Sequence, residues 1–146
     1  MSEQSDPLVK VIDSYREAVL AKDADAFVAL YSDDVHVFDI WDKWSLRGVQ
    51  SWRNMATEWF SSLGSERVIV SVSDVESTSS EELAFGHAIL TYTAVSAEGQ
   101  KLRSLSNRIT LALKRTGESW KIIHEHTSAP IDHETLKAKL HQAEGQ

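Results

Sequence analysis

Histidine and glutamate side chains alternate along one segment near the end of the chain, residues 120–130. The segment reads as a strand, and Pro130 ends it because proline has no N–H to donate to a sheet. Successive side chains of a strand point to opposite faces. This alternation gives two sets, Trp120, Ile122, His124 and His126 on one face, and Lys121, Ile123, Glu125 and Thr127 on the other. Both sets mix apolar and ionisable groups, which predicts a strand covered by a cavity on one side and by a partner on the other.

Three histidines, His87, His124 and His126, raise the question of a metal site. Imidazole is a common ligand of zinc and iron. The three side chains need not converge in space, however, and no carboxylate is placed to orient them. We therefore expect neither a metal ion nor another cofactor. An inward orientation, in which these histidines act as general bases, stays open.

Tryptophans are concentrated in one part of the chain, with four of the five between residues 41 and 59. Trp52 and Trp59 are seven residues apart and share one stripe of a helix, where core packing accounts for most of their role. Trp41 and Trp44 lie in a polar loop beside the expected mouth of a cavity. Aromatic rings there stack on a flat or apolar ligand, or else close the open end.

The bulk composition restricts the classes of function. The chain has 146 residues, no cysteine and a formal net charge of −7. Disulfides and cysteine–zinc sites are excluded, and an acidic chain disfavours nucleic acid as a partner. No apolar run is long enough to span a membrane and no signal-peptide pattern opens the chain. We therefore expect a cytoplasmic protein without a membrane partner.

The expected elements form a single domain over residues 1–146. Residues 1–6 and about 132–146 are predicted terminal extensions, with a helix or an irregular tail over 133–143. The predicted helices cover residues 7 to about 20, 24–31 and 49–63, and the predicted strands cover 35–40, 67–76, 83–96, 102–115 and 120–130. Helices followed by four consecutive antiparallel strands predict an α+β fold, in which a sheet curls around its helices and leaves a cavity.

Two segments resemble the SnoaL-like branch of the nuclear transport factor 2-like superfamily, and the resemblance extends from about Leu8 to Pro130. Residues 11–39 resemble the first two helices and the first strand of steroid delta-isomerases. Residues 120–130 resemble the last strand of the association domain of calcium/calmodulin-dependent protein kinase. The resemblance implies a cone-shaped domain, with a curved antiparallel sheet wrapped around three N-terminal helices and a central cavity. It implies little about function, because this fold hosts isomerases, cyclases, dehydratases, ligand binders and oligomerisation modules.

The resemblance to steroid isomerases makes Tyr15 and Asp39 candidate catalytic residues. In those enzymes a tyrosine on the first helix donates to a developing enolate oxygen, and a carboxylate after the first strand moves the proton. The isomerases also place a second, protonated acid on a later strand. This chain departs from that pattern, because it has no Asp or Glu between Gln100 and Glu118. Alternatively, Tyr15 is a core residue and Asp39 anchors the loop that follows it.

The resemblance to the association domain bears on anion binding. The kinase association domain carries arginines in its cavity, at positions that align near Thr110 and Thr127 of this chain. This chain therefore lacks those arginines. Arg108 lies two residues from Thr110 and is expected to bind a carboxylate in the cavity, or else to pair with Glu125 across the sheet. The complete set of expected substrate-binding residues is Trp41, Trp44, Trp52, Trp59, Tyr92, Arg108, Glu125 and Thr127.

The same alignment turns His124 and His126 away from the cavity, which favours an interface role for the three histidines. Apolar side chains on the expected outer face predict a homodimer there: Phe85, Ile89, Ile109, Leu111 and Ile122. Together these features predict a small-molecule pocket protein, an isomerase, cyclase or hydratase that uses acid–base chemistry without a metal on an apolar, polyketide-like or steroid-like substrate. The alternative is a ligand-binding or oligomerisation module without catalysis.

Overall fold

The computed structural model of the chain describes residues 6–142. Over this range no helix is long and apolar enough to cross a membrane. The helices are α1 (Pro7–Ala21), α2 (Ala24–Val28) and α3 (Val49–Ser62). The strands are β1 (Tyr31–Phe38), β2 (Leu46–Arg47), β3 (Arg67–Ser79), β4 (Leu83–Val95), β5 (Lys101–Thr116) and β6 (Ser119–Ser128). Residues 1–5 and 143–146 of the predicted terminal extensions lie outside the described residues.

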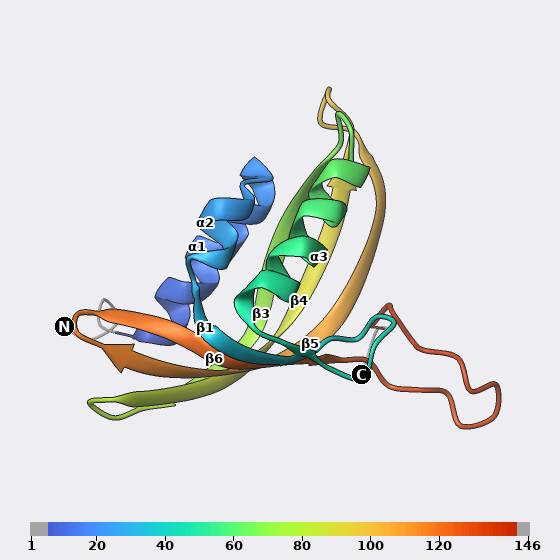
Figure 1. Ribbon diagram of the computed structural model, residues 1–146. Coiled ribbons are helices and arrows are strands. Elements are labelled where there is room, and N and C mark those ends of the chain that lie inside the picture. The colour runs from blue at the N-terminus through green and yellow to red at the C-terminus, as the bar shows by residue number, and fades with distance from the viewer. Residues whose placement is uncertain (1–5, 143–146) are drawn as a thin grey trace.

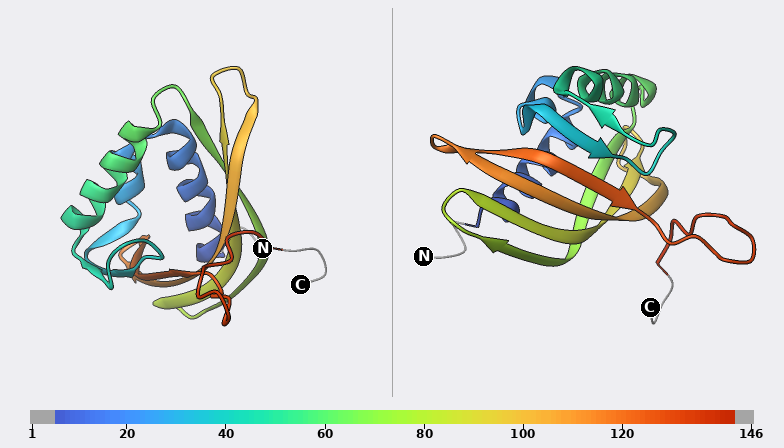
Figure 2. Two further views of the ribbon diagram at one scale, coloured as in Figure 1. Left: turned by 90° about the vertical axis from the view of Figure 1, so that its right-hand side faces the viewer. Right: turned by 60° about the horizontal axis from the view of Figure 1, so that its bottom comes forward.

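The strands join one curved sheet in the order β2-β1-β6-β5-β4-β3. The helices lie on its concave side (Figures 1 and 2), which confirms the predicted α+β class and the curved sheet around helices. Paired strands are antiparallel, except that β1 runs parallel to β6. Helix α1 packs across β3, whereas α3 packs against α2, β1 and β2. The sheet therefore supports α3 at one edge only, and α3 faces β4 and β5 across the interior.

Helix α1 begins where the sequence predicts. The Asp6 side chain accepts hydrogen bonds from the N–H groups of Leu8 and Val9 at 2.9 and 3.3 Å, and Pro7 occupies the first turn, where its missing N–H has no consequence. The helix ends at Lys22, which adopts a left-handed conformation. These two ends fix the rotation of α1, so that Tyr15 lies on its buried face.

The second helix is shorter than predicted, because α2 ends at Val28 and β1 already begins at Tyr31. The Ile122 N–H donates to the carbonyl of Leu30 at 2.8 Å. Pairing with β6 therefore draws Tyr31 into the sheet opposite Ile122, and local helical spacing cannot reveal a partner so far along the chain.

A β-bulge at Ile123 changes the faces of β6. The register with β5 shifts by one residue there, and alternation resumes beyond the bulge with the opposite phase. Ile122 is consequently buried on the same inner face as Glu125 and Thr127, with exposed fractions of 0%, 1% and 5%. The prediction that Ile122 shares the face of His124 is wrong, because strict alternation holds only between bulges.

Part of the predicted outer apolar patch belongs to the core. Ile109, Leu111 and Ile122 are buried in the main hydrophobic cluster, because the sheet places these branched side chains beneath the helices, where their burial contributes most. Phe85 remains exposed and Ile89 partly exposed on the outer face. The prediction therefore holds for two residues of this patch and is wrong for three.

The segment after β6 is irregular over residues 129–142, so the predicted helix over 133–143 does not form within the described residues. An isolated bridge pairs Ile131 with Ala138. The chain then returns to the sheet, where the Ser106 N–H donates to the carbonyl of Leu140 at 2.7 Å. The segment accordingly contacts the edge of β5 beyond the end of β6, where β5 has no β6 partner.

Gly86 on β4 gives a test of how closely α1 packs on the sheet. A methyl group at this position would overlap the carbonyl oxygen of Glu76 and lie 2.5 Å from Leu8 Cδ2. We expect Gly86→Ala to lower the free energy of unfolding by roughly 1–3 kcal/mol, and Gly86→Val to lower it further, as measured by urea denaturation. Unchanged stability of both variants would contradict this packing.

Candidate functional site

A cavity of about 850 Å³ lies between the helices and the inner face of the sheet. Its wall is largely apolar, with polar groups from α1, α3, β4, β5, β6 and the loop after β1. The aromatic and polar residues that line it include Tyr15, Asp39, Trp41, Trp52, Trp59, Tyr92, Arg103, Asn107, Glu125 and Thr127. A few convergent polar groups in an otherwise apolar hollow are typical of a small-molecule site.

Glu125 is the most deeply buried ionisable group of this wall, with 1% of its surface exposed. The Tyr31 hydroxyl donates to Glu125 Oε1 at 2.6 Å. Burial raises the pKa of Glu125 to about 8; the Tyr31 hydrogen bond opposes this shift and the charge of Asp39 adds to it. At neutral pH the carboxyl group is therefore largely protonated and is itself a hydrogen-bond donor.

Tyr15 and Tyr92 form a second polar pair on the same wall. Their hydroxyl oxygens are 2.9 Å apart, and burial raises the pKa of both phenols, so both stay neutral. One hydroxyl donates to the other, which leaves the second with a free O–H. The pair therefore offers one donor to a ligand.

Asp39 follows β1 and reaches the cavity beside Thr127. The Ile40 N–H donates to Thr127 Oγ1 at 2.9 Å, and the Thr127 hydroxyl donates to Asp39 Oδ1 at 3.1 Å. Burial raises the pKa of Asp39, and the nearby charge of Asp42 adds to the rise. Hydrogen bonds to Asp39 from the Thr127 hydroxyl and from the N–H groups of Ile40 and Trp41 oppose it. Asp39 is thus a partly desolvated carboxylate that can accept a proton.

The predicted tryptophans have different positions. Trp52 is buried in an aromatic cluster with Phe27 and Tyr31, and Trp59 contacts Tyr92 edge to face at 6.1 Å between centroids. Trp41 lines the cavity and is 48% exposed. Trp44 is 97% exposed and does not line it, so the expectation that it shapes the cavity is wrong; the loop turns its ring outward to water.

Two buried polar atoms lack a hydrogen-bond partner within residues 6–142, Trp52 Nε1 and Asn107 Oδ1. Both residues line the cavity. A buried donor or acceptor without a partner costs roughly 1–3 kcal/mol. The cavity wall therefore carries more hydrogen-bonding capacity than the chain itself satisfies.

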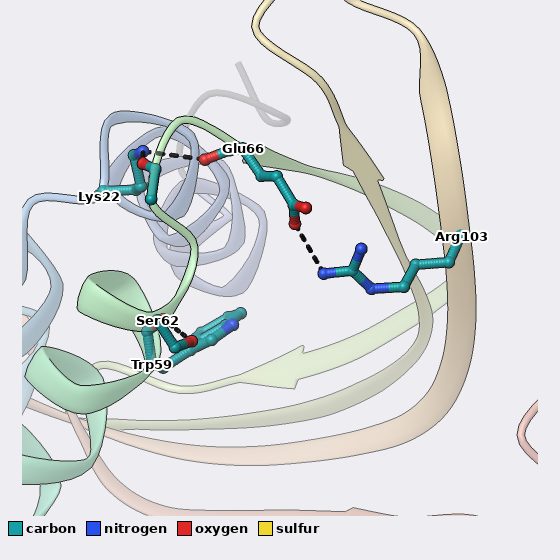
Figure 3. A network of polar contacts seen from close by, with 6 residues as sticks. Lys22, Trp59, Ser62, Glu66 and Arg103 are labelled. Carbon is teal, nitrogen blue, oxygen red and sulfur yellow. Dashed lines mark hydrogen bonds and ion pairs between the residues drawn. The ribbon is translucent and has the colours of Figure 1, made fainter.

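Arg108 lies outside the cavity. Its Nε donates to Ser128 Oγ at 3.0 Å on the outer face, and the inward position next to it belongs to Asn107. The expectations that Arg108 serves the cavity or pairs with Glu125 are therefore wrong, because the two residues lie on opposite faces. The arginine that does line the cavity is Arg103, which pairs with Glu66 at 2.7 Å (Figure 3).

The histidines of β6 face outward with β1. His124 Nδ1 lies 2.7 Å from the carbonyl oxygen of His36, and Phe38 contacts both His124 and His126. His87 lies on the same outer face in β4, opposite Thr110 of β5. Within the described part of the chain, no group of three or more His, Cys, Asp or Glu side chains could hold a metal ion.

The sequence interpretation gives no site role to Arg103 and Asn107, which line the cavity, or to Tyr31, whose hydroxyl donates to Glu125. The strand of Tyr31 was predicted to begin too late. A signal for Arg103 and Asn107 existed, because they continue the alternation of Ile109 and Leu111 backward along β5. Their inner position follows once the face of those aliphatic residues is known.

Residues 8–132 match the model of the SnoaL-like domain family. The chain belongs to the SnoaL-like family. Among curated proteins, no sequence matches this SnoaL-like chain.

Solved structures with the same fold are numerous, and the three that follow share under 25% identity with this chain, so their likeness shows the fold alone. An NTF2-like protein of unknown function from Pseudomonas putida is 22% identical, with a TM-score of 0.82 over 98% of each chain. A calcium/calmodulin-dependent protein kinase II association domain-like protein from Xanthomonas campestris is 15% identical, with a TM-score of 0.71 over 84% of this chain and 85% of that one. Aln2 from a Streptomyces species is 12% identical, with a TM-score of 0.75 over 88% and 91%. The SnoaL-like fold includes enzymes and non-catalytic members, so the chemistry depends on the cavity.

The state of Glu125 gives a prediction about stability and pH. Its folded pKa of about 8 lies above the ordinary value of 4.5, so the unfolded chain releases a proton that the folded chain keeps. This contribution to the free energy of unfolding is fully present below pH 4.5 and is lost as the pH rises through 8, at about 1.4 kcal/mol per pH unit.

Glu125→Gln keeps an acceptor for Tyr31 but cannot ionise. We expect the variant to gain stability relative to the wild type between pH 6 and pH 8.5, measured by urea unfolding; a constant difference would contradict a neutral Glu125.

Proposed function

We propose that the cavity binds a small carbonyl compound and catalyses proton transfer beside the carbonyl group. The observation that carries this proposal is the buried Glu125 carboxyl, whose pKa burial raises and which shares one cavity with the Tyr15–Tyr92 pair and the Asp39 carboxylate. Donors for an oxyanion and a base for a proton are the two requirements of enolisation. Residues of this chain supply both, and the reaction class is an isomerase or lyase that needs no metal.

Asp39 is the base in this proposal. Its carboxylate takes a proton from the carbon next to the carbonyl, and the electrons of that C–H bond move into an enolate. Return of the proton to the γ-carbon of a β,γ-unsaturated ketone yields the conjugated isomer and restores the carboxylate. Partial burial, which raises the pKa of Asp39, increases its basicity.

Glu125 and the tyrosine pair are the donors to the enolate oxygen. The second protonated acid that the resemblance to isomerases requires is absent from β5, and Glu125 on the neighbouring strand β6 offers the same chemistry. A neutral donor in a site shielded from water stabilises an oxyanion more strongly than water does. Tyr31 holds the carboxyl group in place through its bond to Oε1.

Asp39→Asn tests the role of the base. We expect the variant to lose roughly 10²- to 10⁴-fold in the rate of hydrogen–deuterium exchange at carbon next to the carbonyl of cyclic ketones, measured by NMR in D₂O. Binding of the same ketones, followed by tryptophan fluorescence, should change little because the amide keeps the shape of the side chain.

Asp132→Asn, far from the cavity lining, is the matched control. An exchange rate that survives Asp39→Asn would contradict the role of Asp39. Ketones that bind without exchange in the wild type would favour the alternative, a ligand-binding module without catalysis.

We also propose that two copies associate through the outer face of β4, β5 and β6. Phe85 is 55% exposed, and its neighbours across the sheet are Ala112 of β5 and then His124 of β6. Aromatic, histidine and small side chains thus form a continuous surface without a carboxylate at these positions. Surfaces of this composition are typical of protein–protein contacts.

Phe85→Glu tests the interface. A buried glutamate facing its symmetry mate is unfavourable, so the dimer should dissociate at least tenfold more readily in analytical ultracentrifugation. Val9→Glu, at a 38% exposed position on α1, is the matched control and should leave the mass unchanged. A wild-type protein that sediments as a monomer at all concentrations would contradict the proposal.

A further inference from the structure

One end of the cavity combines an apolar wall with a cationic side chain. Strand register places Val68, Ala94 and Arg103 side by side on β3, β4 and β5. The next inward row contains Tyr92 and Leu105. Successive inward positions of a strand are about 7 Å apart, so Arg103 lies one step along the cavity wall from the tyrosine pair.

Arg103 is held across the mouth of the cavity. Its Nη2 donates to Glu66 Oε1 at 2.7 Å, and the two side chains are 60% and 31% exposed. Figure 3 shows Glu66 reaching toward β5 while its own segment is fixed by Lys22, whose Nζ donates to the carbonyls of Gly64 and Glu66 at 2.7 and 2.8 Å. Glu66 is the only partner of Arg103 within residues 6–142, so most of the five guanidinium N–H groups stay available.

Stability does not account for this arrangement. Ion pairs with this exposure contribute little to folding, because water screens them and two long side chains lose freedom. The other cation of the cavity lining is Lys43, which follows Asp42 in the loop after β1. An anion bound there would be repelled by the carboxylates of Asp42 and Asp39. The Arg103 end therefore offers the better place for a negative charge.

We propose that the cavity takes an elongated, apolar monoanion whose carboxylate or sulfonate group replaces Glu66 on Arg103. The apolar body then lies along Val68, Ala94 and Leu105, with its other end at the Tyr15–Tyr92 pair. The remaining carboxylates of the lining, Asp39, Asp42 and Glu58, disfavour a second negative charge. This inference rests on the proposed binding cavity and adds the class of ligand, and it does not depend on catalysis.

Two fluorescent probes with the same aromatic body test the inference. 1-Anilinonaphthalene-8-sulfonate carries a sulfonate, and N-phenyl-1-naphthylamine lacks it. In Arg103→Gln we expect affinity for the sulfonate probe to fall roughly three- to tenfold, the effect of one charge-assisted contact near water. Affinity for the neutral probe should stay within about twofold, because the apolar contacts are retained.

Glu66→Gln makes the test decisive, because it removes the carboxylate that competes with the ligand anion for Arg103. Affinity for the sulfonate probe should rise severalfold in this variant and again stay constant for the neutral probe. If the ion pair had a structural role only, both variants would shift affinity in the same direction, and that result would overturn the inference. Arg108→Gln on the outer face is the matched control and should change neither affinity.

The outcomes separate the two proposals. Equal responses of both probes to Arg103→Gln would overturn the anion site and leave ketone exchange untouched. A wild-type protein that catalyses no hydrogen–deuterium exchange would overturn the proposed catalysis. The anion site would still be upheld if Arg103→Gln and Glu66→Gln changed affinity for the sulfonate probe in opposite directions. Failure of the wild type to bind either probe would overturn the anion site.

Discussion

The burial of one carboxyl group governs the interior of this protein. Glu125 lies in the middle of the sheet with 1% of its surface exposed, where a charged carboxylate would be strongly unfavourable. The folded chain meets this constraint by keeping the group protonated and by directing the Tyr31 hydroxyl at it. Side chains around the carboxyl group must then leave room for a polar hydrogen and its partners. A fully apolar, close-packed core is impossible at this point.

The bulge at Ile123 makes this arrangement possible. Below it, Ile122 closes the apolar core against β1 and β5; above it, Glu125 and Thr127 line the cavity from the same face. Without the extra residue, burial of Ile122 would turn Glu125 outward and bring His124 inward. One strand therefore serves both as core and as cavity wall, and the local change of phase separates the two roles.

Much of the fold follows from the sequence because its signals are local. Asp6 and Pro7 mark the start of α1, and glycine-containing turns separate β4 from β5 and β5 from β6. The placement of Tyr31 depends on pairing with a strand far along the chain, and the bulge at Ile123 leaves no trace in an alternating pattern. For the site, residue types alone single out Tyr15 and Asp39 as a pair and Glu125 separately, and they favour Arg108 over Arg103 because the register of β5 is not visible in the sequence. Residue types identify the chemistry, and only the register decides which of two arginines faces the cavity.

The cavity wall carries polar side chains at positions where apolar side chains would stabilise the fold more. Glu125, Tyr15, Tyr92 and Asn107 all occupy inner positions where an aliphatic side chain would stabilise the core by roughly 1.5–3 kcal/mol. Within residues 6–142, Asn107 Oδ1 additionally has no hydrogen-bond partner. A domain whose only task was to present its outer face to a second copy would gain stability by filling this space, as Leu90 and Leu113 do elsewhere in the core. Polar side chains at these four positions give up part of that stability, and this cost is the physical argument for the proposed ligand site in the cavity.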